Sequence, residues 1–364
     1  MQPRCICFFN SNKAWGGGEN WHFRNALLAR DKGYRVCFVA NAESALGDRL
    51  EGQSGITLLR LDLSNLSFLN PLTLLCLARF FRINAVEAVI LALPADVKAG
   101  GLAARLAGVR DIIYRRGIAV PVRDRLFNRF LFRFVLTKLI VNSLNTRDCV
   151  LAENPRLIEP TRVHLVHCGF DVAAQDGLPA RPLVERRVGE ILIGNAARLT
   201  AQKGQKLLLG IAAHLKQQPI PFRLLIAGTG ELEQELKAQA RQLGVEDVVE
   251  FLGFVADMKS FYQTIDIFAL TSLWEGFGQA LVEAMESGKP VVAWDVSSNP
   301  EVVGAGETGF LCPVDDTKAF ADRLLTLMQD EALRLRLGEN GRARVLAHFE
   351  MHECFAALER CLKA

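Results

Sequence analysis

Short, unbroken apolar segments recur along the chain, and each is followed by a helical pattern. Strands of this kind are buried on both faces, as in a parallel sheet covered by its crossover helices. In the first half the apolar segments are Arg4–Asn10, Arg35–Ala40, Ile56–Leu61, Ala88–Leu93, Asp111–Arg115 and Lys138–Asn142. The helical patterns between them are Asn20–Lys32, Pro71–Arg82, Val97–Leu106 and Asp124–Leu136. This alternation predicts an α/β fold with a doubly wound sheet.

The same alternation starts again in the second half. Its apolar segments are Glu190–Gly194, Phe222–Ala227, Val248–Leu252, Ile265–Leu270 and Pro290–Trp294. A segment rich in Gly, Asp and Ala, His164–Ala180, separates the two series and is predicted to be a hinge. Since 364 residues are too many for one ordinary core, we expect two Rossmann-like domains, residues 1–168 and 169–345, facing across a cleft.

The two halves of the chain carry opposite charge. Residues 1–170 hold 23 lysines and arginines against 13 aspartates and glutamates, a net of +10. The remainder holds 20 against 27, a net of −7. This asymmetry favours an anionic partner for the first domain. Random divergence of the surface charge of the two halves, without any function, would also produce it.

Composition and pattern exclude several classes of protein. No apolar run approaches the ~18 residues that cross a bilayer, and Met1–Asn10 leads straight into a strand without a secretory pattern. The nine cysteines are scattered singly, which indicates neither a disulfide framework nor a zinc array. We therefore expect a reduced, cytoplasmic protein without a metal, and the absence of any nucleic-acid-binding motif argues against RNA or DNA as a partner.

A glycine turn follows the first predicted strand. Gly16, Gly17 and Gly18 precede a helix, whose free N–H groups favour an anion. The nicotinamide-cofactor fingerprint fails here, because the residue three after Gly18 is Trp21. A tight turn without a binding role is the alternative.

The second half carries the residues most suited to chemistry. Arg198 and Lys203 follow a strand end five residues apart, where a fork-shaped and a point cation suit a diphosphate. Another strand ends in the glycine turn Gly228-Thr229-Gly230, a possible backbone wall for a base or ribose. Each signal is weak alone, because surface cations and glycine turns are usually only solvated or structural.

The stretch from Glu275 to Glu283 is the most informative. Gly276, Phe277 and Gly278 open a helix, where exposed N–H groups and the helix dipole favour an anion. Glu275 and Glu283, eight residues apart, are suited to hydrogen bonds with sugar and ribose hydroxyls. A solvated helix face is the alternative for Glu283, and its apolar neighbours weaken it.

In this order these motifs resemble the GT-B retaining glycosyltransferases of family 4. Two further segments, Pro300-Glu301-Val302-Val303 and Thr308-Gly309-Phe310-Leu311, share the resemblance, which covers residues 198–311 closely and the first domain loosely through residues 16–19. It implies a nucleotide-diphosphate-sugar donor as substrate and no cofactor. It also implies that the last segment, 346–364, is a helix crossing back to the first domain.

The resemblance further implies a role for each candidate residue. Arg198 and Lys203 would hold the leaving diphosphate, while Glu275 with the Phe277–Gly278 backbone would hold the transferred sugar. Glu283 would hold the ribose, and Phe254 and Val255 would lie near the base. Donors fixed on the departing diphosphate lower the barrier without a metal, so we expect metal-independent transfer with retention of configuration.

The sequence departs from the family at one position. Many members have a histidine after the strand that corresponds to Asp111–Tyr114, whereas this chain reads Arg115-Arg116-Gly117. Arg116 would substitute by stabilising negative charge, since a guanidinium cannot act as a base. Ordinary solvated cations are the alternative reading of both arginines.

The segment Arg123–Leu136 alternates arginines with aromatic residues. As a helix it would place Arg125, Arg129 and Arg133 in one stripe, with Phe132 and Leu136 projecting beside them. This pattern favours contact with an anionic membrane surface and a glycan or lipid-linked acceptor, as in lipopolysaccharide assembly. An amphipathic helix packed on its own sheet is the alternative.

Two other functions are compatible with this fold. A nucleotide-sugar epimerase would need acid and base residues at the sugar, and the first domain offers no evident pair. A non-catalytic membrane-bound scaffold would not need Arg198, Lys203, Glu275 and Glu283. The pattern therefore favours a glycosyltransferase at the cytoplasmic face of the membrane.

Overall fold

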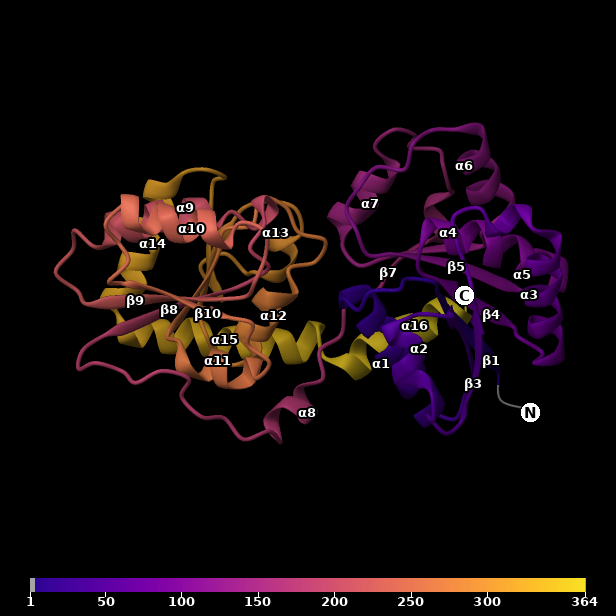
Figure 1. The fold of residues 1–364 in the computed structure, drawn as a ribbon, viewed down its shortest axis with the longest axis horizontal. Coiled ribbons are helices and arrows are strands. Elements are labelled where there is room, and N and C mark those ends of the chain that lie inside the picture. The colour runs from indigo at the N-terminus through magenta and orange to yellow at the C-terminus, as the bar shows by residue number, and fades with distance from the viewer. Residues whose placement is uncertain (1–3, 364) are drawn as a thin grey trace. The chain divides into compact units, whose positions relative to one another are not determined.

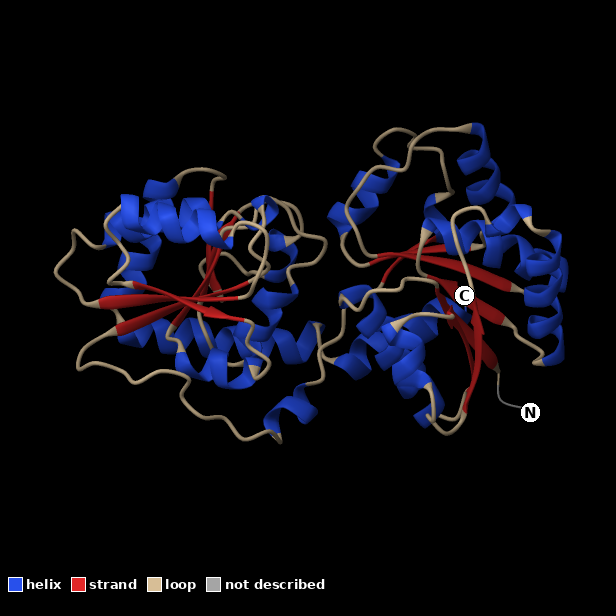
Figure 2. Cartoon of the chain, viewed as in Figure 1, coloured by secondary structure: helices blue, strands red, loops and turns tan. Residues whose placement is uncertain are grey.

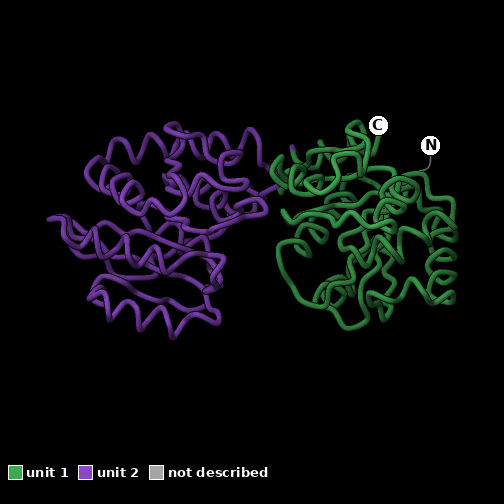
Figure 3. Tube along the Cα trace, turned by 90° about the horizontal axis from the view of Figure 1, so that it is seen from above, with its two compact units in different colours: residues 1–168, 354–364 green, residues 169–353 purple. Residues whose placement is uncertain are grey.

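The computed structural model describes residues 4–363 of the chain. Its strands form two sheets, one of seven strands and one of six, and every paired strand runs parallel to its neighbour (Figure 2). The expectation of two doubly wound sheets is confirmed. The chain divides into two compact units (Figure 3): unit 1 holds residues up to 168 and from 354 onward, and unit 2 holds residues 169–353.

The sheet of unit 1 has the strand order β3-β2-β1-β4-β5-β6-β7. Its strands are β1 (Cys5–Asn10), β2 (Arg35–Asn41), β3 (Ile56–Leu61), β4 (Ala88–Leu91), β5 (Asp111–Arg116), β6 (Lys138–Val141) and β7 (Val163–Leu165). The helices and helical turns of residues 4–168 are α1 (Gly17–Asp31), α2 (Ala45–Leu50), η1 (Ser67–Leu69), α3 (Pro71–Ile83), α4 (Pro94–Asp96), η2 (Val97–Gly101), α5 (Leu102–Ala107), α6 (Leu126–Phe130), η3 (Leu131–Val135), α7 (Leu144–Leu151) and η4 (Pro160–Arg162). The central strands run parallel and are covered on both faces, which agrees with sequences that are apolar throughout.

Alternate residues of the central strand β1 face two separate cores. Cys7 and Phe9 pack with the core formed by α3, α5 and η3, whereas Ile6 and Phe8 pack with the core formed by α1, α2 and the last helix, α16 (Met351–Lys363). Both sides are fully buried, which is why the strand reads as one apolar run rather than an alternation.

Helix α16 is bound to unit 1 by polar contacts as well as by packing. The Tyr34 hydroxyl donates to Glu359 at 2.7 Å, and Lys138 Nζ donates to the Cys361 carbonyl at 2.8 Å. Phe355 and Leu358 lie in the core under α1. The end of the chain therefore completes one face of the first sheet.

The sheet of unit 2 has the strand order β10-β9-β8-β11-β12-β13. Its strands are β8 (Ile191–Ala196), β9 (Phe222–Ala227), β10 (Val249–Gly253), β11 (Ile267–Leu270), β12 (Val291–Trp294) and β13 (Gly309–Cys312). Its helices and helical turns are α8 (Val172–Asp176), η5 (Ala201–Lys203), α9 (Gln205–Leu215), α10 (Glu233–Gln242), α11 (Met258–Thr264), α12 (Gln279–Glu286), α13 (Asn299–Val302), α14 (Thr317–Gln329) and α15 (Glu331–His348).

Helices cover both faces of this second sheet. Figure 1 shows α9, α10 and α14 on one face and α11 and α15 on the other. Trp294 of β12 packs edge-on against Phe320 of α14 in the first layer, and Tyr262 of α11 packs against Phe268 of β11 in the second. The arrangement leaves the loops after the strands at one edge of the sheet.

Some element boundaries differ from the prediction. Helix α1 begins at Gly17, three residues before the predicted start, so Gly17 and Gly18 form its first turn. The predicted hinge His164–Ala180 begins inside strand β7, which pairs with β6 at the edge of the sheet, and it contains α8. Strand β13 was not predicted.

The prediction for Arg123–Leu136 is wrong in two respects. The helix begins at Leu126, and its second half is a π-helical turn, η3. The wider turn rotates Phe132 into the core, and Leu136 leaves the helix with an extended backbone, so these side chains are 4% and 0% exposed rather than beside the arginines. The exposed apolar side chains are instead Leu126, Phe127, Phe130 and Phe134.

Among residues 4–363 we find no helix both long and apolar enough to cross a membrane.

Candidate active site

The loops at the carboxyl ends of β8, β9, β10 and β11 in unit 2 bring most of the predicted residues to one edge. In a parallel sheet these ends share an edge, and open α/β sheets bind ligands there. The loop after β8 carries Arg198 and Lys203, and the loop after β11 carries Glu275. Helix α12 starts at the same edge and carries Glu283.

Lys203 and Glu275 form a direct ion pair. Lys203 Nζ donates to Glu275 Oε1 at 2.6 Å, and the two side chains are 16% and 11% exposed. Charges removed this far from water need a partner, because an unpaired one is costly. The pair therefore places one ammonium and one carboxylate in fixed positions at the ligand edge.

The turn η5 holds Lys203 against the loop after β11. Leu273 N donates to the Gln202 carbonyl at 2.8 Å, and Gln202 Nε2 donates to the Trp274 carbonyl at 2.9 Å. Gly204 follows η5 with a φ of +64°, and a Cβ there would lie 2.1 Å from the Thr271 carbonyl oxygen. Only glycine allows this close approach without strain.

A cavity of about 290 Å³ lies beside these loops. Six of the predicted residues line it: Arg198, Gly228, Thr229, Phe254, Val255 and Glu283. Arg198 is exposed, and no ion pair or side-chain hydrogen bond of its guanidinium occurs among the described residues. Phe254 presents an exposed ring. A cation, an aromatic face and a carboxylate around one cavity suit a phosphorylated nucleoside.

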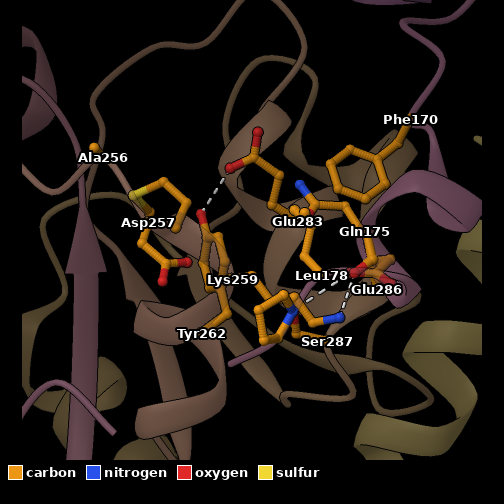
Figure 4. A pocket seen from close by; sticks show the side chains of 12 residues that line it. Phe170, Gln175, Leu178, Ala256, Asp257, Lys259, Tyr262, Glu283, Glu286 and Ser287 are labelled. Carbon is orange, nitrogen blue, oxygen red and sulfur yellow. Dashed lines mark hydrogen bonds between the residues drawn. The ribbon is translucent and has the colours of Figure 1, made fainter. Parts of the chain in front are cut away.

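Glu283 accepts a hydrogen bond from the Tyr262 hydroxyl at 3.0 Å. Burial, with the nearby Glu283 carboxylate, raises the pKa of Tyr262 well above its usual value, so the phenol remains a donor. Both side chains also line an adjoining cavity of about 600 Å³, and Figure 4 shows them pointing toward one another. The phenol holds one carboxylate oxygen of Glu283 in place.

Gly276, Phe277 and Gly278 lead into α12. Gly278 is the N-cap residue, with a φ of +77°. The Phe277 ring is buried against Phe349, with ring centroids 5.6 Å apart. The Phe277 side chain is therefore packed within unit 2.

The glycine turn after β9, two residues of which line the cavity of about 290 Å³, also packs closely against a neighbouring loop. A Cβ at Gly228 would lie 2.0 Å from the Ala197 carbonyl oxygen, and one at Gly230 would lie 2.3 Å from the Leu199 carbonyl oxygen. The residues that approach these glycines most closely thus belong to the loop that carries Arg198. Their small size positions that loop.

Buried polar atoms without a partner are frequent at this edge. Within the described chain they include Thr200 Oγ1, Gln205 Oε1, Ser272 Oγ, Ser298 Oγ and Asn299 Oδ1. Native proteins satisfy most buried polar groups with protein atoms, water or a ligand. A polar ligand or ordered water at this edge would satisfy these five atoms.

In unit 1 the predicted Gly16–Gly18 turn already contains an anion. The buried Glu19 carboxylate accepts from Asn10 Nδ2 at 3.2 Å and from Asn12 Nδ2 at 2.9 Å at the start of α1. A second negative group there would be repelled. Anion binding at Gly16, Gly17 and Gly18 stays a prediction that Glu19 disfavours.

The two arginines of β5 lie on opposite faces, as neighbours in a strand must. Arg116 donates to the Tyr114 hydroxyl at 2.9 Å and to the Val120 carbonyl at 3.0 Å. Arg115 instead lies over the Trp21 ring of α1, 4.7 Å from its centre, and a Cβ at Gly18 would lie 4.0 Å from its guanidinium. The cation beside the glycine turn is therefore Arg115. The interpretation of Arg115 as an ordinary solvated cation is wrong, because this residue is buried, and strand alternation was the signal that could have shown this.

Comparison with known proteins shows what the second unit is similar to. Residues 181–344 match the sequence model of the glycosyl transferases group 1. This segment is therefore similar in sequence to that family. It contains Arg198, Lys203, Glu275 and Glu283, so the described edge lies within the shared region.

Curated relatives match part of the chain. The amylovoran biosynthesis glycosyltransferase AmsK of Erwinia amylovora is 36% identical over 177 residues, 46% of this chain and 44% of the relative. The lipopolysaccharide core biosynthesis mannosyltransferase LpsB of Rhizobium meliloti is 33% identical over 168 residues, 44% of this chain and 48% of the relative. The chain spans about half the length of the curated relatives it matches.

Solved structures share the fold of the entire chain. A glycosyltransferase from Rickettsia africae has a TM-score of 0.84 at 18% identity, covering 100% of this chain and 99% of that one. Anabaena Alr3699/HepE, in complex with UDP and glucose, has a TM-score of 0.78 at 23% identity and covers 99% of each chain. The chain has the GT-B fold.

Within the described residues no group of three or more His, Cys, Asp or Glu side chains is arranged to hold a metal ion. The expectation that no metal is needed stays a prediction.

Proposed function

We propose that this protein is a glycosyltransferase that moves a sugar from a nucleotide-diphosphate donor to a glycan or lipid-linked acceptor. The observation that carries the proposal is the Lys203–Glu275 pair beside the start of α12 and the cavity lined by Arg198 and Glu283. This combination supplies cations for a diphosphate and carboxylates for hydroxyl groups at one edge.

The charges suit the reaction. As the bond from the sugar to the diphosphate breaks, negative charge grows on the departing oxygens and positive charge on the sugar ring. Lys203, Arg198 and the N–H groups that begin α12 stabilise the departing diphosphate. Lys203 exchanges its contact with Glu275 for a phosphate oxygen, which leaves the carboxylate to accept from sugar hydroxyls.

We propose that the configuration at the sugar carbon is retained. The acceptor hydroxyl attacks on the face that the diphosphate leaves, and its proton passes to a phosphate oxygen. The carbon–oxygen bond to the phosphate breaks as the bond to the acceptor forms. Since fixed cations supply the positive field, we expect turnover to continue in the presence of EDTA.

The acceptor is proposed to be membrane-associated, as part of surface polysaccharide assembly on the cytoplasmic face. Unit 1 exposes a set of apolar side chains on and beside η1, α3, α6 and η3, here called the apolar surface: Leu66, Leu69, Leu72, Leu75, Leu126, Phe127, Phe130 and Phe134. Its two parts meet where the Phe68 and Phe127 rings lie 5.4 Å apart. Exposed arginines 123, 125 and 133 accompany it, which suits an anionic bilayer.

A donor panel tests the proposal. UDP-, GDP- and ADP-sugars are incubated with the protein, and release of the free nucleoside diphosphate is measured. Turnover of at least one donor is expected, and Glu275→Ala should lower it by about 10–100-fold, the value of one charge-assisted hydrogen bond. The control is Glu235→Ala, which removes an exposed glutamate paired with Lys206.

Two results would contradict the proposal. A scaffold would release no nucleotide and would not be stabilised by any nucleoside diphosphate in a thermal melt. Equal turnover in Glu275→Ala and the parent protein would show that the sugar binds elsewhere.

A further inference from the structure

Unit 1 contains a cavity of about 370 Å³ at the carboxyl ends of β4 and β5. Four cations line it: Lys98, Arg116, Arg123 and Arg125. We call it the basic pocket. It lies at the edge of the first sheet where doubly wound domains bind ligands, and none of the roles proposed above uses it as a binding site.

The cations of the basic pocket have no acidic partner. Within residues 4–363 no carboxylate lies at ion-pair distance from any of the four. Asp124 separates Arg123 and Arg125 in the chain, but its carboxylate accepts from Arg129 at 2.7 Å and from Asn154 at 2.8 Å. Asp96 is buried and accepts from backbone N–H groups of Leu93 and Ser11. A cleft lined by one sign of charge concentrates ligands of the other sign.

Arg116 is held in place before any ligand arrives. Its two terminal nitrogens donate to the Tyr114 hydroxyl and the Val120 carbonyl, at 2.9 and 3.0 Å. Its Nε is buried without an acceptor. The guanidinium is thus fixed by neutral groups, and its positive charge remains available to the pocket.

The rest of the wall is apolar and continues to the exposed surface. Phe127 lines the pocket and belongs to the apolar surface, and Leu131 and Phe132 line the pocket's interior. Lys98 lies over the ring of Phe68, 5.6 Å from its centre, between the two regions. A ligand with a charged group beside an apolar portion matches this wall.

We propose that the basic pocket binds a phosphate or diphosphate group of the acceptor. The proposal rests on the proposed function, because it names the acceptor chemistry of that same reaction. Four cations without an acidic partner favour a multiply charged group over a single carboxylate. Each arginine can also donate two parallel hydrogen bonds to two oxygens of one phosphate. The group belongs either to a lipid headgroup or to a soluble sugar phosphate.

Hydrogen exchange of residues 117–128 tests the proposal. Inorganic pyrophosphate is the soluble probe, and vesicles of equal parts phosphatidylcholine and phosphatidic acid are the bilayer probe. Pyrophosphate is expected to slow exchange in this segment at least twofold in the parent protein and in Lys203→Ala. The protection should disappear in Arg125→Gln and in Arg116→Gln.

The matched control is Arg110→Gln. Arg110 precedes β5 at its opposite end and is largely exposed, so the same charge is removed away from the pocket. Its protection by pyrophosphate should equal that of the parent protein. Because Arg125 is exposed, its replacement tests the pocket even where Arg116→Gln unfolds the chain.

The outcomes separate the possible ligands. Protection by pyrophosphate and by vesicles assigns the pocket to a lipid headgroup, and protection by pyrophosphate alone assigns it to a soluble phosphate. Protection by vesicles alone, or protection that persists in Arg125→Gln, would contradict the proposal that the basic pocket binds a phosphate group.

Failure of the proposed function gives a different result. In that case nucleoside diphosphates fail to protect residues 198–204 of unit 2, whatever happens at residues 117–128.

Discussion

Among the individual residues of the ligand edge, Lys203 and Glu275 are the most strongly coupled, because they form a largely buried ion pair. Each charge is mostly withdrawn from water and depends on the other. In a double-mutant cycle with Lys203→Ala and Glu275→Ala, we expect a coupling free energy of about 1–3 kcal/mol in unfolding. The Lys206–Glu235 pair is the control, since its side chains are about half exposed and should couple by about 0–1 kcal/mol. Equal coupling in the two pairs would contradict this account.

Asp96 makes stability depend on pH. Burial raises the pKa of its carboxyl to about 7. Between about pH 4 and 7 the unfolded chain loses this proton while the folded chain keeps it, so stability falls as pH rises through that window. Asp96→Asn cannot ionise, and Asn can still accept from Leu93 N.

The free energy of unfolding of Asp96→Asn should therefore rise by about 2 kcal/mol relative to that of the parent protein between pH 5 and pH 8. Urea unfolding of both proteins at the two pH values measures the difference. A free-energy difference that does not change with pH would show that the carboxyl is already ionised in the fold.

Residue types and their spacing predicted many of the residues at the ligand edge of unit 2. They did not predict which of these side chains contact one another. Lys203 and Glu275 are 72 positions apart, and nothing in the sequence alone shows that they touch. Arg115 and Arg116 could be assigned to opposite faces from strand alternation. Which face α1 covers follows only from the packing of Trp21 over Arg115.

Elements come together at the ligand edge through close backbone contacts. Gly204 connects η5 to α9 and approaches the Thr271 carbonyl. Gly204→Ala should destabilise the fold by about 2–4 kcal/mol, through left-handed strain and displacement of the loop after β11. It should also weaken nucleotide binding, because η5 carries Lys203.

Gly244→Ala is the matched control. Gly244 has nearly the same φ, +65°, but a Cβ there would meet no atom within 4 Å. Gly244→Ala should lower the free energy of unfolding by about 1 kcal/mol and leave nucleotide affinity unchanged. Equal effects of the two substitutions on affinity would show that the close approach to Thr271 does not position Lys203.

Buried strands were the most predictable elements, because apolar runs bounded by turns follow directly from burial on both faces. The segment 123–136 was not, since periodicity assumes a regular α-helix. The π-helical turn η3 shifts the faces, and it buries Phe132 while exposing Phe134. Edge strands such as β7 have few residues and a half-buried pattern, and the sequence signal was correspondingly weak.

Charge is divided unevenly over the whole molecule, with a net of +10 in residues 1–170. We expect the protein to bind vesicles of phosphatidylcholine and phosphatidic acid through the apolar surface, and less tightly at high salt. Phe134→Ser removes a ring that is 67% exposed and should weaken binding by about 10–100-fold, the value of burying one such side chain.

Val188→Ser is the control, because it removes an exposed apolar side chain from unit 2. Co-sedimentation of both variants with vesicles measures the effect. If Phe134→Ser bound as well as Val188→Ser, the apolar surface would not contact lipid.

Calorimetric titration with UDP, GDP and ADP tests most directly whether the second unit binds a diphosphate through Lys203. The account predicts that at least one of the three binds, that Lys203→Ala binds about 10–100-fold more weakly, and that Lys206→Ala binds as the parent protein does. Heats indistinguishable from dilution for all three nucleotides, or equal affinities in Lys203→Ala and Lys206→Ala, would contradict it.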